Sequence, residues 1–322
     1  MTTLPTATAT TVPGAVTVDL EGAAQRAAHL AEAGTAEATR RAYRTDWDHF
    51  TSWCAAAGLD ALPAAPTTAG LYIAAHESTH ALATLQRRLA SISTLHRLAG
   101  HHLDTRHPAI AGVLRGLRRT KGTSQRQVEA ITVPMLRALV DTCGDDLLGV
   151  RDRALLLVGF ASALRRSELV GLEIGDVAIT EAGARITVLR SKTDQDGAGQ
   201  VVGVARTGTA TCPVAALETW LTQAGIVEGR VFRRVDRHGR IGASLSDDAV
   251  ALVVKKRAAL AGLDPTGFAG HSLRAGFATS AAIVGVEERV IAEVTRHRSG
   301  VVRRYIRAGG LFRRNLAAEV GL

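Results

Sequence analysis

The chain has 322 residues, a mass of 33.8 kDa and 46% hydrophobic residues. This composition excludes an intrinsically disordered protein, and the length allows two domains that each bury a core. The formal net charge of +9 and the pI of about 10.3 favour a polyanionic partner, with nucleic acid the first candidate, although a basic solvated surface gives the same totals.

Local features narrow the class further. Cys54, Cys143 and Cys212 lie far apart without a CxxC pair, which predicts buried, reduced thiols in a cytoplasmic protein rather than disulfides or a zinc site. No apolar run reaches the roughly 18 residues of a membrane span. Residues 1–18 are rich in Thr, Ala and Pro and predict a disordered tail, not a signal peptide.

Residues 19–119 predict a small all-α bundle. Apolar side chains recur at helical steps from a candidate N-cap at Thr35 to a stop at Gly58. A second helix is expected to begin after Pro66, and a shorter one covers residues 110–117. A third helix is expected in "ALATLQRRLASISTLHRLAG". Its apolar side is formed by Leu82, Leu85, Leu89, Ile92 and Leu95, and Arg87 and Arg88 lie off that side.

Basic side chains on and after this bundle are candidates for contacts with phosphates. The polar, basic segment 120–130 is expected to be an interdomain linker. A solvated surface is the alternative for every one of these positions. The candidates are Arg40, Arg41, Arg44, Arg87, Arg88 and Lys121.

Residues 131–322 mix helices and strands, so the predicted fold class is mainly α with a small β-sheet (α+β). Residues 150–164 predict a buried helix and residues 166–172 a short one. Alternating apolar residues at 186–188 and 202–204 predict strands, with Gly-bearing turns between the runs. Pro213 is expected to open a helix, and Ser246 to cap another.

Several stretches of this half offer groups suited to a phosphate. Arg165 in "ALRRSEL" and Arg274 in "HSLRAG" each supply a guanidinium fork that matches two phosphate oxygens. His271 shares a helix face with Arg274 because the two are three residues apart. Taken singly, these motifs are weak, because a surface arginine and a chance HxxR are the more common explanations.

Three further residues complete the set. Lys192 in "LRSKTDQDG" sits in a predicted hairpin tip, where an ammonium can deliver a proton to a leaving alkoxide. His297 in "TRHRSG" can donate to a phosphate oxygen, and Tyr305 in "VVRRYIRAGG" is a phenol surrounded by arginines. An ordinary turn lysine, a structural histidine, and a packing or base-stacking tyrosine are the alternatives.

These candidate residues follow one another in the order Arg, Lys, HxxR, His, Tyr. With this order, the chain resembles a tyrosine recombinase of the phage integrase family. The resemblance covers about residues 35–316 and is strongest in "ALRRSELVGLEIGDV", "HSLRAGFAT" and "TRHRSGVVRRYI". It implies a helical, SAM-like core-binding domain at 19–119 and a catalytic domain at 131–322. It also implies an orienting role for Glu168 and catalytic roles for Arg165, Lys192, His271, Arg274, His297 and Tyr305.

The chemistry of these groups agrees with that resemblance. A phenol has a pKa near 10, so nearby cations must favour the phenolate. Guanidinium groups also neutralise the added charge of a pentavalent phosphorane. Tyr305 is expected to form a 3′-phosphotyrosyl bond while Lys192 protonates the departing 5′-oxygen. Because the link retains the ester energy, rejoining needs no ATP, and no metal or other cofactor is expected.

The chain departs from the family pattern at two places. His297 and Tyr305 are eight positions apart, one fewer than in many members, which would rotate the tyrosine by about 100° on a helix unless a loop absorbs the difference. Arg296 stands where the family often has glycine.

The predicted function is therefore site-specific recombination of double-stranded DNA. The resemblance implies a homo-tetramer in the synaptic complex and a monomer free in solution, with the segment after Tyr305 docking on a neighbouring subunit or packing in cis. The alternatives are a type IB topoisomerase-like enzyme that relaxes DNA, and a non-catalytic DNA-binding protein on an integrase scaffold.

Overall fold

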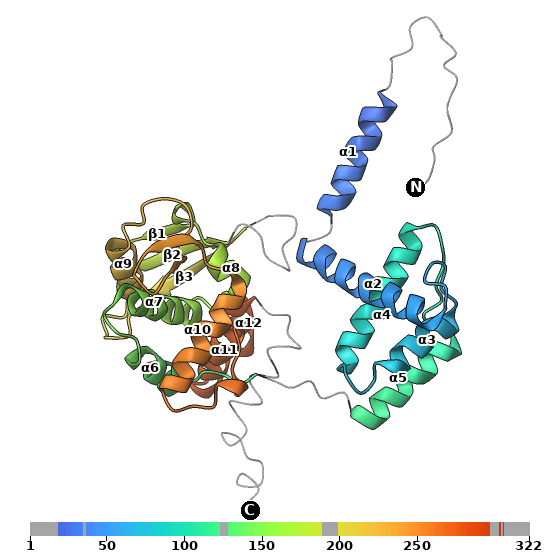
Figure 1. The fold of residues 1–322 in the computed structure, drawn as a ribbon. Helices are drawn as coiled ribbons and strands as arrows, with labels where there is room; N and C mark the ends of the chain where they lie inside the picture. The colour runs from blue at the N-terminus through green and yellow to red at the C-terminus, as the bar shows by residue number, and fades with distance from the viewer. Residues whose placement is uncertain are drawn as a thin grey trace, which may run out of the picture. The chain divides into compact units, whose positions relative to one another are not determined.

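The computed structural model describes residues 19–34, 37–122, 128–188 and 199–296, together with Arg303 and Tyr305. It divides into two compact units, Met1–Arg126 and Gln127–Leu322 (Figure 1). The predicted tail at 1–18, the predicted cap at Thr35, the candidates Lys192 and His297, and the segment after Tyr305 lie outside the described residues. Within the described ranges, no helix is long and apolar enough to cross a membrane.

The described part of the first unit is helical, as predicted. Its helices are α1 (Leu20–Ala33), α2 (Glu37–Ala57), α3 (Pro66–Ala75), α4 (Leu82–Leu98) and α5 (Pro108–Lys121). Gly58 follows α2 with a φ of 66°, a left-handed conformation that glycine adopts without strain and that stops the helix. Helix α5 is longer than expected and includes residues 120 and 121, which were predicted to begin the linker.

The core of this unit lies between α2, α3, α4 and α5. Its fully buried side chains include Phe50, Tyr72, Leu85, Ile92 and Ile110. The predicted apolar side of α4 is largely confirmed, because Leu85, Leu89 and Ile92 are buried. The prediction was wrong for Arg88, which is also buried.

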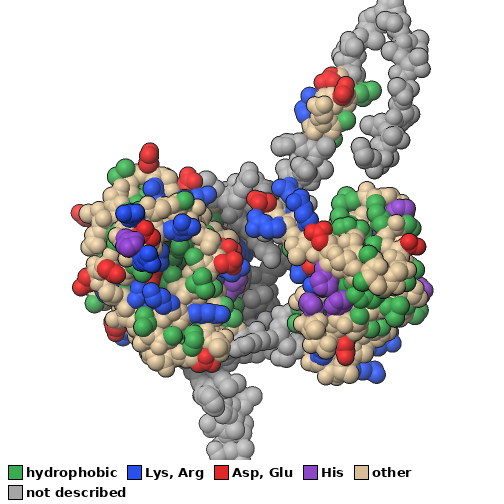
Figure 2. Space-filling view, in the orientation of Figure 1, with side chains coloured by type: hydrophobic (Ala, Val, Ile, Leu, Met, Phe, Trp, Pro, Cys, Tyr) green, Lys and Arg blue, Asp and Glu red, His purple; other side chains and the backbone are tan. Residues whose placement is uncertain are grey.

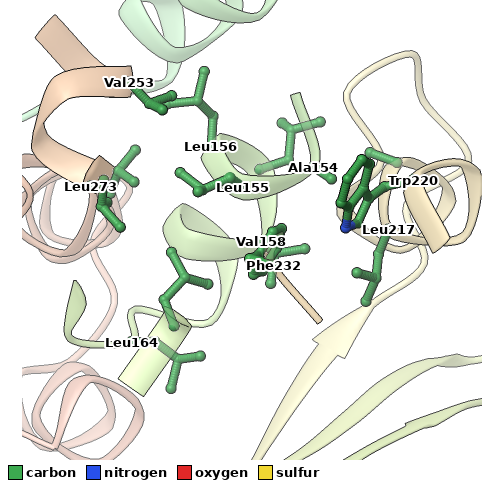
Figure 3. Packing of buried hydrophobic residues seen from close by; sticks show 14 of the residues in the cluster. Ala154, Leu155, Leu156, Val158, Leu164, Leu217, Trp220, Phe232, Val253 and Leu273 are labelled. Carbon is green, nitrogen blue, oxygen red and sulfur yellow. The ribbon is translucent and has the colours of Figure 1, made fainter. Parts of the chain in front are cut away.

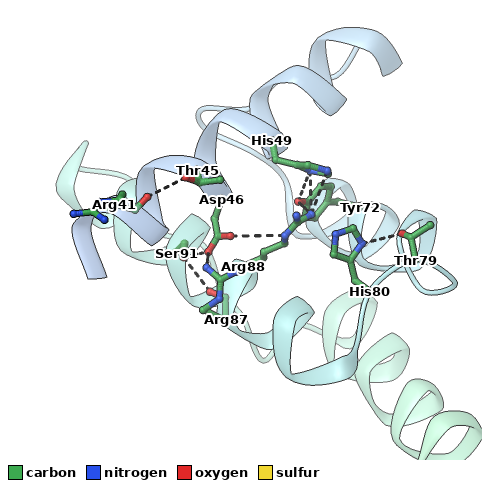
Figure 4. Close-up of polar contacts among 10 residues, drawn as sticks. All are labelled: Arg41, Thr45, Asp46, His49, Tyr72, Thr79, His80, Arg87, Arg88 and Ser91. Carbon is green, nitrogen blue, oxygen red and sulfur yellow. Dashed lines mark hydrogen bonds and ion pairs between the residues drawn. The ribbon is translucent and has the colours of Figure 1, made fainter. Parts of the chain in front are cut away.

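Polar contacts explain why an arginine enters this core (Figure 4). Arg88 Nη1 lies 2.8 Å from the hydroxyl of Tyr72 and 3.1 Å from Nδ1 of His49. Asp46, only 1% exposed, accepts from Ser91 Oγ at 2.8 Å and from Arg87. The carboxylate of α2 therefore ties α4 in place through charge-assisted hydrogen bonds.

Within the described residues, the second unit contains seven α-helices and two short 3-10 helices, Ile174–Asp176 and Pro265–Gly267. The α-helices are α6 (Val133–Asp141), α7 (Leu147–Ala161), α8 (Arg166–Gly171), α9 (Pro213–Gln223), α10 (Asp247–Leu260), α11 (Ser272–Ile283) and α12 (Glu288–Thr295). Pro213 opens α9, and Ser246 Oγ caps α10 by accepting from Ala249 N at 3.3 Å, so both predicted starts are confirmed.

A three-stranded antiparallel sheet has the order β1 (Val177–Ile179), β2 (Gly183–Val188) and β3 (Gln200–Ala205). Ile186 pairs with Val202, and both side chains are buried, which confirms the predicted alternation. A second, two-stranded ribbon of β4 (Arg233–Val235) and β5 (Ile241–Ser244) was not predicted.

Helix α7 is central to this unit and is buried on all sides. It packs against α6, α9, α10 and α11. Figure 3 shows Leu155 and Leu156 of α7 between Trp220 of α9 and Leu273 of α11. The carboxyl end of α7 is thereby held rigidly where the chain turns into α8.

Candidate active site

The turn between α7 and α8 positions the first candidate arginine. After the α7 C-cap at Ser162, Ala163 is fully buried and adopts a left-handed φ of 47°. An alanine in this region is strained by about 1–3 kcal/mol, so the surrounding packing must hold it. The turn brings Arg165 to the N-cap of α8.

Glu168 in the first turn of α8 fixes Arg165. Its Oε2 accepts from the backbone N–H of Arg165 at 2.9 Å, and its Oε1 accepts from Arg165 Nη1 at 2.5 Å. Both side chains are largely buried, at 15% and 4% exposure. The guanidinium fork of Arg165 is therefore anchored on one edge.

Arg274 reaches the same turn from α11. It is 2% exposed, and its Nη1 donates to the Ala163 carbonyl at 2.7 Å. Burial, with the charges of Arg165 and Arg296 nearby, lowers the pKa of Arg274 to about 10, and Glu168 and Tyr305 oppose that change. Arg274 thus stays cationic at neutral pH in surroundings that favour an incoming anion.

Arg296 is a third arginine at this place, which the sequence did not assign to the site. It follows α12 as a C-cap, and its Nη2 donates to Glu168 Oε2 at 2.9 Å and to the Ala163 carbonyl at 3.4 Å. The one available signal was an arginine at a position where the family often has glycine. Its convergence with Glu168, 128 residues away, is visible only in the folded chain.

Tyr305 lies against the helices that carry this cluster. It is half-buried and packs on Ala278, Ala282 and Ile291 of α11 and α12. A negative charge on its phenol would raise the pKa of Arg274, so the two side chains are electrostatically coupled. The structure therefore brings Arg165, Arg274 and Tyr305 together from three distant segments.

The remaining catalytic candidates are placed less completely. His271 is the exposed N-cap of α11, three residues before Arg274. Lys192 belongs to the sequence between β2 and β3, and His297 follows Arg296, but both lie outside the described residues.

The candidates for phosphate contacts in the first unit differ in exposure. Arg40, Arg41 and Arg44 are exposed near the start of α2, where Figure 2 shows Lys and Arg side chains gathered. Arg87 is half-exposed and paired with Asp46, whereas Arg88 is buried and directed at Tyr72. Lys121 is exposed, and its Nζ donates to the carbonyl of His80 at 3.2 Å.

The fold defines the class of protein. Two solved structures share it: the XerH site-specific recombinase bound to palindromic difH substrate (TM-score 0.57, 16% identity, 77% of this chain and 70% of that one) and a lambda integrase dimer bound to a COC′ core site (TM-score 0.56, 15% identity, 89% and 77%). At these identities the likeness shows an integrase fold and no more.

Sequence comparison gives the family. The phage integrase family profile matches residues 129–309. An integrase/recombinase xerD homolog of Selenomonas ruminantium is 40% identical over 88% of this chain and 85% of its own length. Tyrosine recombinase XerD of Bifidobacterium longum is 30% identical over 83% and 85%. The chain belongs to the phage integrase family and is a tyrosine recombinase, an enzyme that cleaves and rejoins DNA in site-specific recombination. The topoisomerase-like and non-catalytic alternatives are not favoured.

Proposed function

We propose that Tyr305 is the nucleophile and that Arg165 and Arg274 bind the scissile phosphate. The observation that carries this proposal is the convergence at Ala163: Arg274 donates to its carbonyl, Arg165 follows two residues later, and Tyr305 is coupled to Arg274. Guanidinium groups fixed by protein acceptors before the reaction lose little entropy when they meet a developing oxyanion.

In the proposed reaction, Tyr305 reacts as the phenolate that the nearby guanidinium charges favour, after its proton has passed to water. The phenolate oxygen forms a bond to phosphorus while the bond from phosphorus to the 5′-oxygen breaks. Lys192 gives its proton to that 5′-oxygen. His271 and His297 donate hydrogen bonds to the phosphate oxygens. Religation reverses the step, with a 5′-hydroxyl of the exchanged strand attacking the 3′-phosphotyrosyl bond, so that the tyrosine is the leaving group and no external energy source is consumed.

We further propose that the partner is double-stranded DNA held by both units. The exposed arginines Arg40, Arg41 and Arg44 of α2, with Arg87 and Lys121, supply positive charge for phosphates from the first unit. The burial of Arg88 favours a structural role for that residue instead. The protein is a monomer in solution and a homo-tetramer on paired sites in the cytoplasm.

The test is covalent trapping. The substrate is a nicked suicide duplex that carries a site selected by its binding to the wild-type protein. Cleavage releases the short fragment that bears the new 5′-hydroxyl, so the adduct cannot religate. Wild type is expected to accumulate a denaturant-resistant adduct. Tyr305→Phe is expected to bind the duplex and form none, whereas the control Tyr43→Phe, on α2 of the first unit, behaves like wild type. An adduct formed by Tyr305→Phe contradicts the proposal.

A further inference from the structure

Arg296 occupies a backbone conformation that does not suit it. Its φ is 51° and its ψ 39°, in the left-handed region. Glycine adopts this conformation freely, whereas a side chain with a Cβ is strained there. Strained residues with a non-glycine side chain persist where the surrounding structure over-determines them, which happens mostly at functional sites.

The contacts of Arg296 interlock with those of the proposed arginine pair. Its Nη2 shares the carboxylate of Glu168 with Arg165, at 2.9 Å and 2.5 Å respectively. The same atom shares the Ala163 carbonyl with Arg274, at 3.4 Å and 2.7 Å. Each acceptor that positions one arginine of the pair therefore also positions Arg296.

The rest of its guanidinium has no acceptor. The side chain is 5% exposed, and Nε and Nη1 are buried without a hydrogen-bond partner among the residues that the structure describes. Burial lowers the pKa of Arg296, with Arg165 acting in the same direction and Glu168 opposing it. Buried charged donors without acceptors are costly, so this arrangement favours binding of an anion that offers several oxygens.

The charge balance of the cluster leads to the same conclusion. Among the residues that the structure describes, this cluster holds three guanidiniums, of Arg165, Arg274 and Arg296, and one carboxylate, of Glu168, which is a formal excess of two positive charges. A pentavalent phosphorane carries two negative charges, one more than the phosphodiester from which it forms.

We propose that Arg296 is a third guanidinium of the phosphate cradle and that its Nε and Nη1 donate to the non-bridging oxygens of the scissile phosphate. This inference rests on the proposed function, because it assigns the ligand of the same site. The glycine common at this position in the family has no side chain that could do this. Arg296 is then a catalytic residue specific to chains that carry it.

The decisive variants are Arg296→Gly, which suits the left-handed backbone and removes the guanidinium, and Arg296→Lys, which keeps the charge without the fork. Arg289→Ala, an exposed arginine on α12, is the control. Two readouts are used on the 322-residue chain: the rate of adduct formation with the suicide duplex, and the rise in melting temperature caused by tungstate, a tetrahedral oxyanion, without DNA.

Arg296→Gly is expected to slow adduct formation about 10²- to 10³-fold, the usual effect of removing one preorganised donor. It should also weaken tungstate binding at least about tenfold, since one of three cations is lost. Arg296→Lys should fall between Arg296→Gly and wild type, and the control should match wild type. Without anion, Arg296→Gly should melt no lower than wild type, because backbone strain and unsatisfied donors are both removed.

A merely structural Arg296 gives a different pattern: Arg296→Gly then melts lower without anion, and its tungstate affinity is unchanged. The proposal is also overturned if the wild type shows no tungstate-dependent rise, or if Arg296→Gly shows an equal one. If the wild type forms no adduct, the assigned function of the site fails, while the tungstate comparison still decides whether Arg296 belongs to an anion-binding cradle.

Discussion

At the scale of single residues, the site depends on how Glu168 divides its two oxygens between two arginines. Oε1 holds the Arg165 side chain, and Oε2 holds the Arg165 backbone and Arg296. With its oxygens occupied in this way, the carboxylate orients the cations without neutralising both of them. The positive charge left over is what a phosphate in the site would meet.

Arg165→Lys tests the need for a fork at this position. Lysine keeps the charge but cannot donate to Glu168 and to a phosphate with the fixed geometry of a guanidinium. Cleavage of the suicide duplex should slow about 10²- to 10³-fold, while duplex affinity measured by fluorescence anisotropy changes little. Arg166→Lys is the matched control, because the neighbouring Arg166 pairs at the surface with Asp247 and Asp248. Equal cleavage rates in the two variants would contradict the assignment.

The sequence indicated Arg165, Arg274 and Tyr305 from their motifs, and the structure brings all three together. It did not indicate Arg296 or the burial of Arg88. Both depend on carboxylates, carbonyls or hydroxyls contributed by other helices, such as Glu168 for Arg296 and Tyr72 for Arg88. A helical pattern classes an arginine as exposed unless a distant partner is known, so neither could be found from local sequence.

At the scale of elements, α11 must pack directly on the backbone of the segment before α6. Ile131 N donates to the carbonyl of Ser272 at 3.1 Å, and a Cβ added to Gly276 would lie 1.9 Å from the Ile131 carbonyl oxygen. Glycine is therefore required in "HSLRAGFAT" for close approach, in the helix that carries Arg274.

Gly276→Ala should accordingly destabilise the second unit. Either α11 or the segment at Ile131 must shift, and overpacking of this kind costs about 1–3 kcal/mol. Gly116→Ala on α5 is the opposite case, since nothing lies within 4 Å of its added Cβ and alanine favours a helix by about 0.5–1 kcal/mol. Chemical denaturation should show a lower free energy of unfolding for the first variant and a higher one for the second. A neutral Gly276→Ala would show that the packing is not as close as described.

The first unit also carries a cluster of histidines, with His49 on α2 and His76 and His80 in the connection from α3 to α4. The ring centroids of His49 and His76 are 4.8 Å apart, and those of His76 and His80 are 5.7 Å apart. Burial, Arg88 and His76 lower the pKa values of both His49 and His80 below the ordinary 6.5; Lys121 adds to this at His80, and Asp46 opposes it at His49.

The folded protein therefore binds protons at these histidines less readily than the unfolded chain. Stability that is present above about pH 6.5 should be lost as the pH falls below that value. Calorimetry of the wild type at pH 7.5 and 5.5 should show the transition of the first unit moving to lower temperature in acid. His80→Gln, which cannot titrate, should reduce that movement. An equal acid sensitivity in this variant would mean that other groups are responsible.

Helix starts were predicted accurately where one residue decides them, as at Pro66, Pro213 and Ser246. The β4–β5 ribbon was missed for a physical reason. Its strands are three and four residues long and only partly buried. Two of the three residues of β4 are arginines, and β5 contains a glycine and a serine, so neither alternation nor β-propensity distinguishes them from a polar loop.

At the scale of the whole molecule, the proposed tetramer needs a surface for a second copy. Apolar side chains around the end of α11 and the start of α12 are exposed, namely Ile283 (45%), Val284 (73%), Val286 (38%) and Val290 (37%). Exposed apolar side chains so close together in the sequence are candidates for a protein interface, and we propose that assembly uses these helices.

Val284→Asp should therefore impair assembly without affecting the fold of one subunit. An aspartate at so exposed a position costs the monomer little but would have to be desolvated in an interface. Sedimentation of protein with DNA carrying paired sites should show loss of the tetrameric complex, while binding to a single site stays normal. Val227→Asp, at an 82% exposed position after α9, is the control and should assemble normally. Normal assembly of Val284→Asp would exclude this surface.

The proposed active site is tested most directly by identifying the residue that becomes bonded to DNA. Wild-type adduct on the suicide duplex, digested with nuclease and protease, should yield one peptide that carries a nucleotide mass on Tyr305 when sequenced by tandem mass spectrometry. This mass is expected on Tyr305 and on neither Tyr43 nor Tyr72, the two other tyrosines of the chain. A nucleotide on any residue other than Tyr305 would contradict the proposed active site.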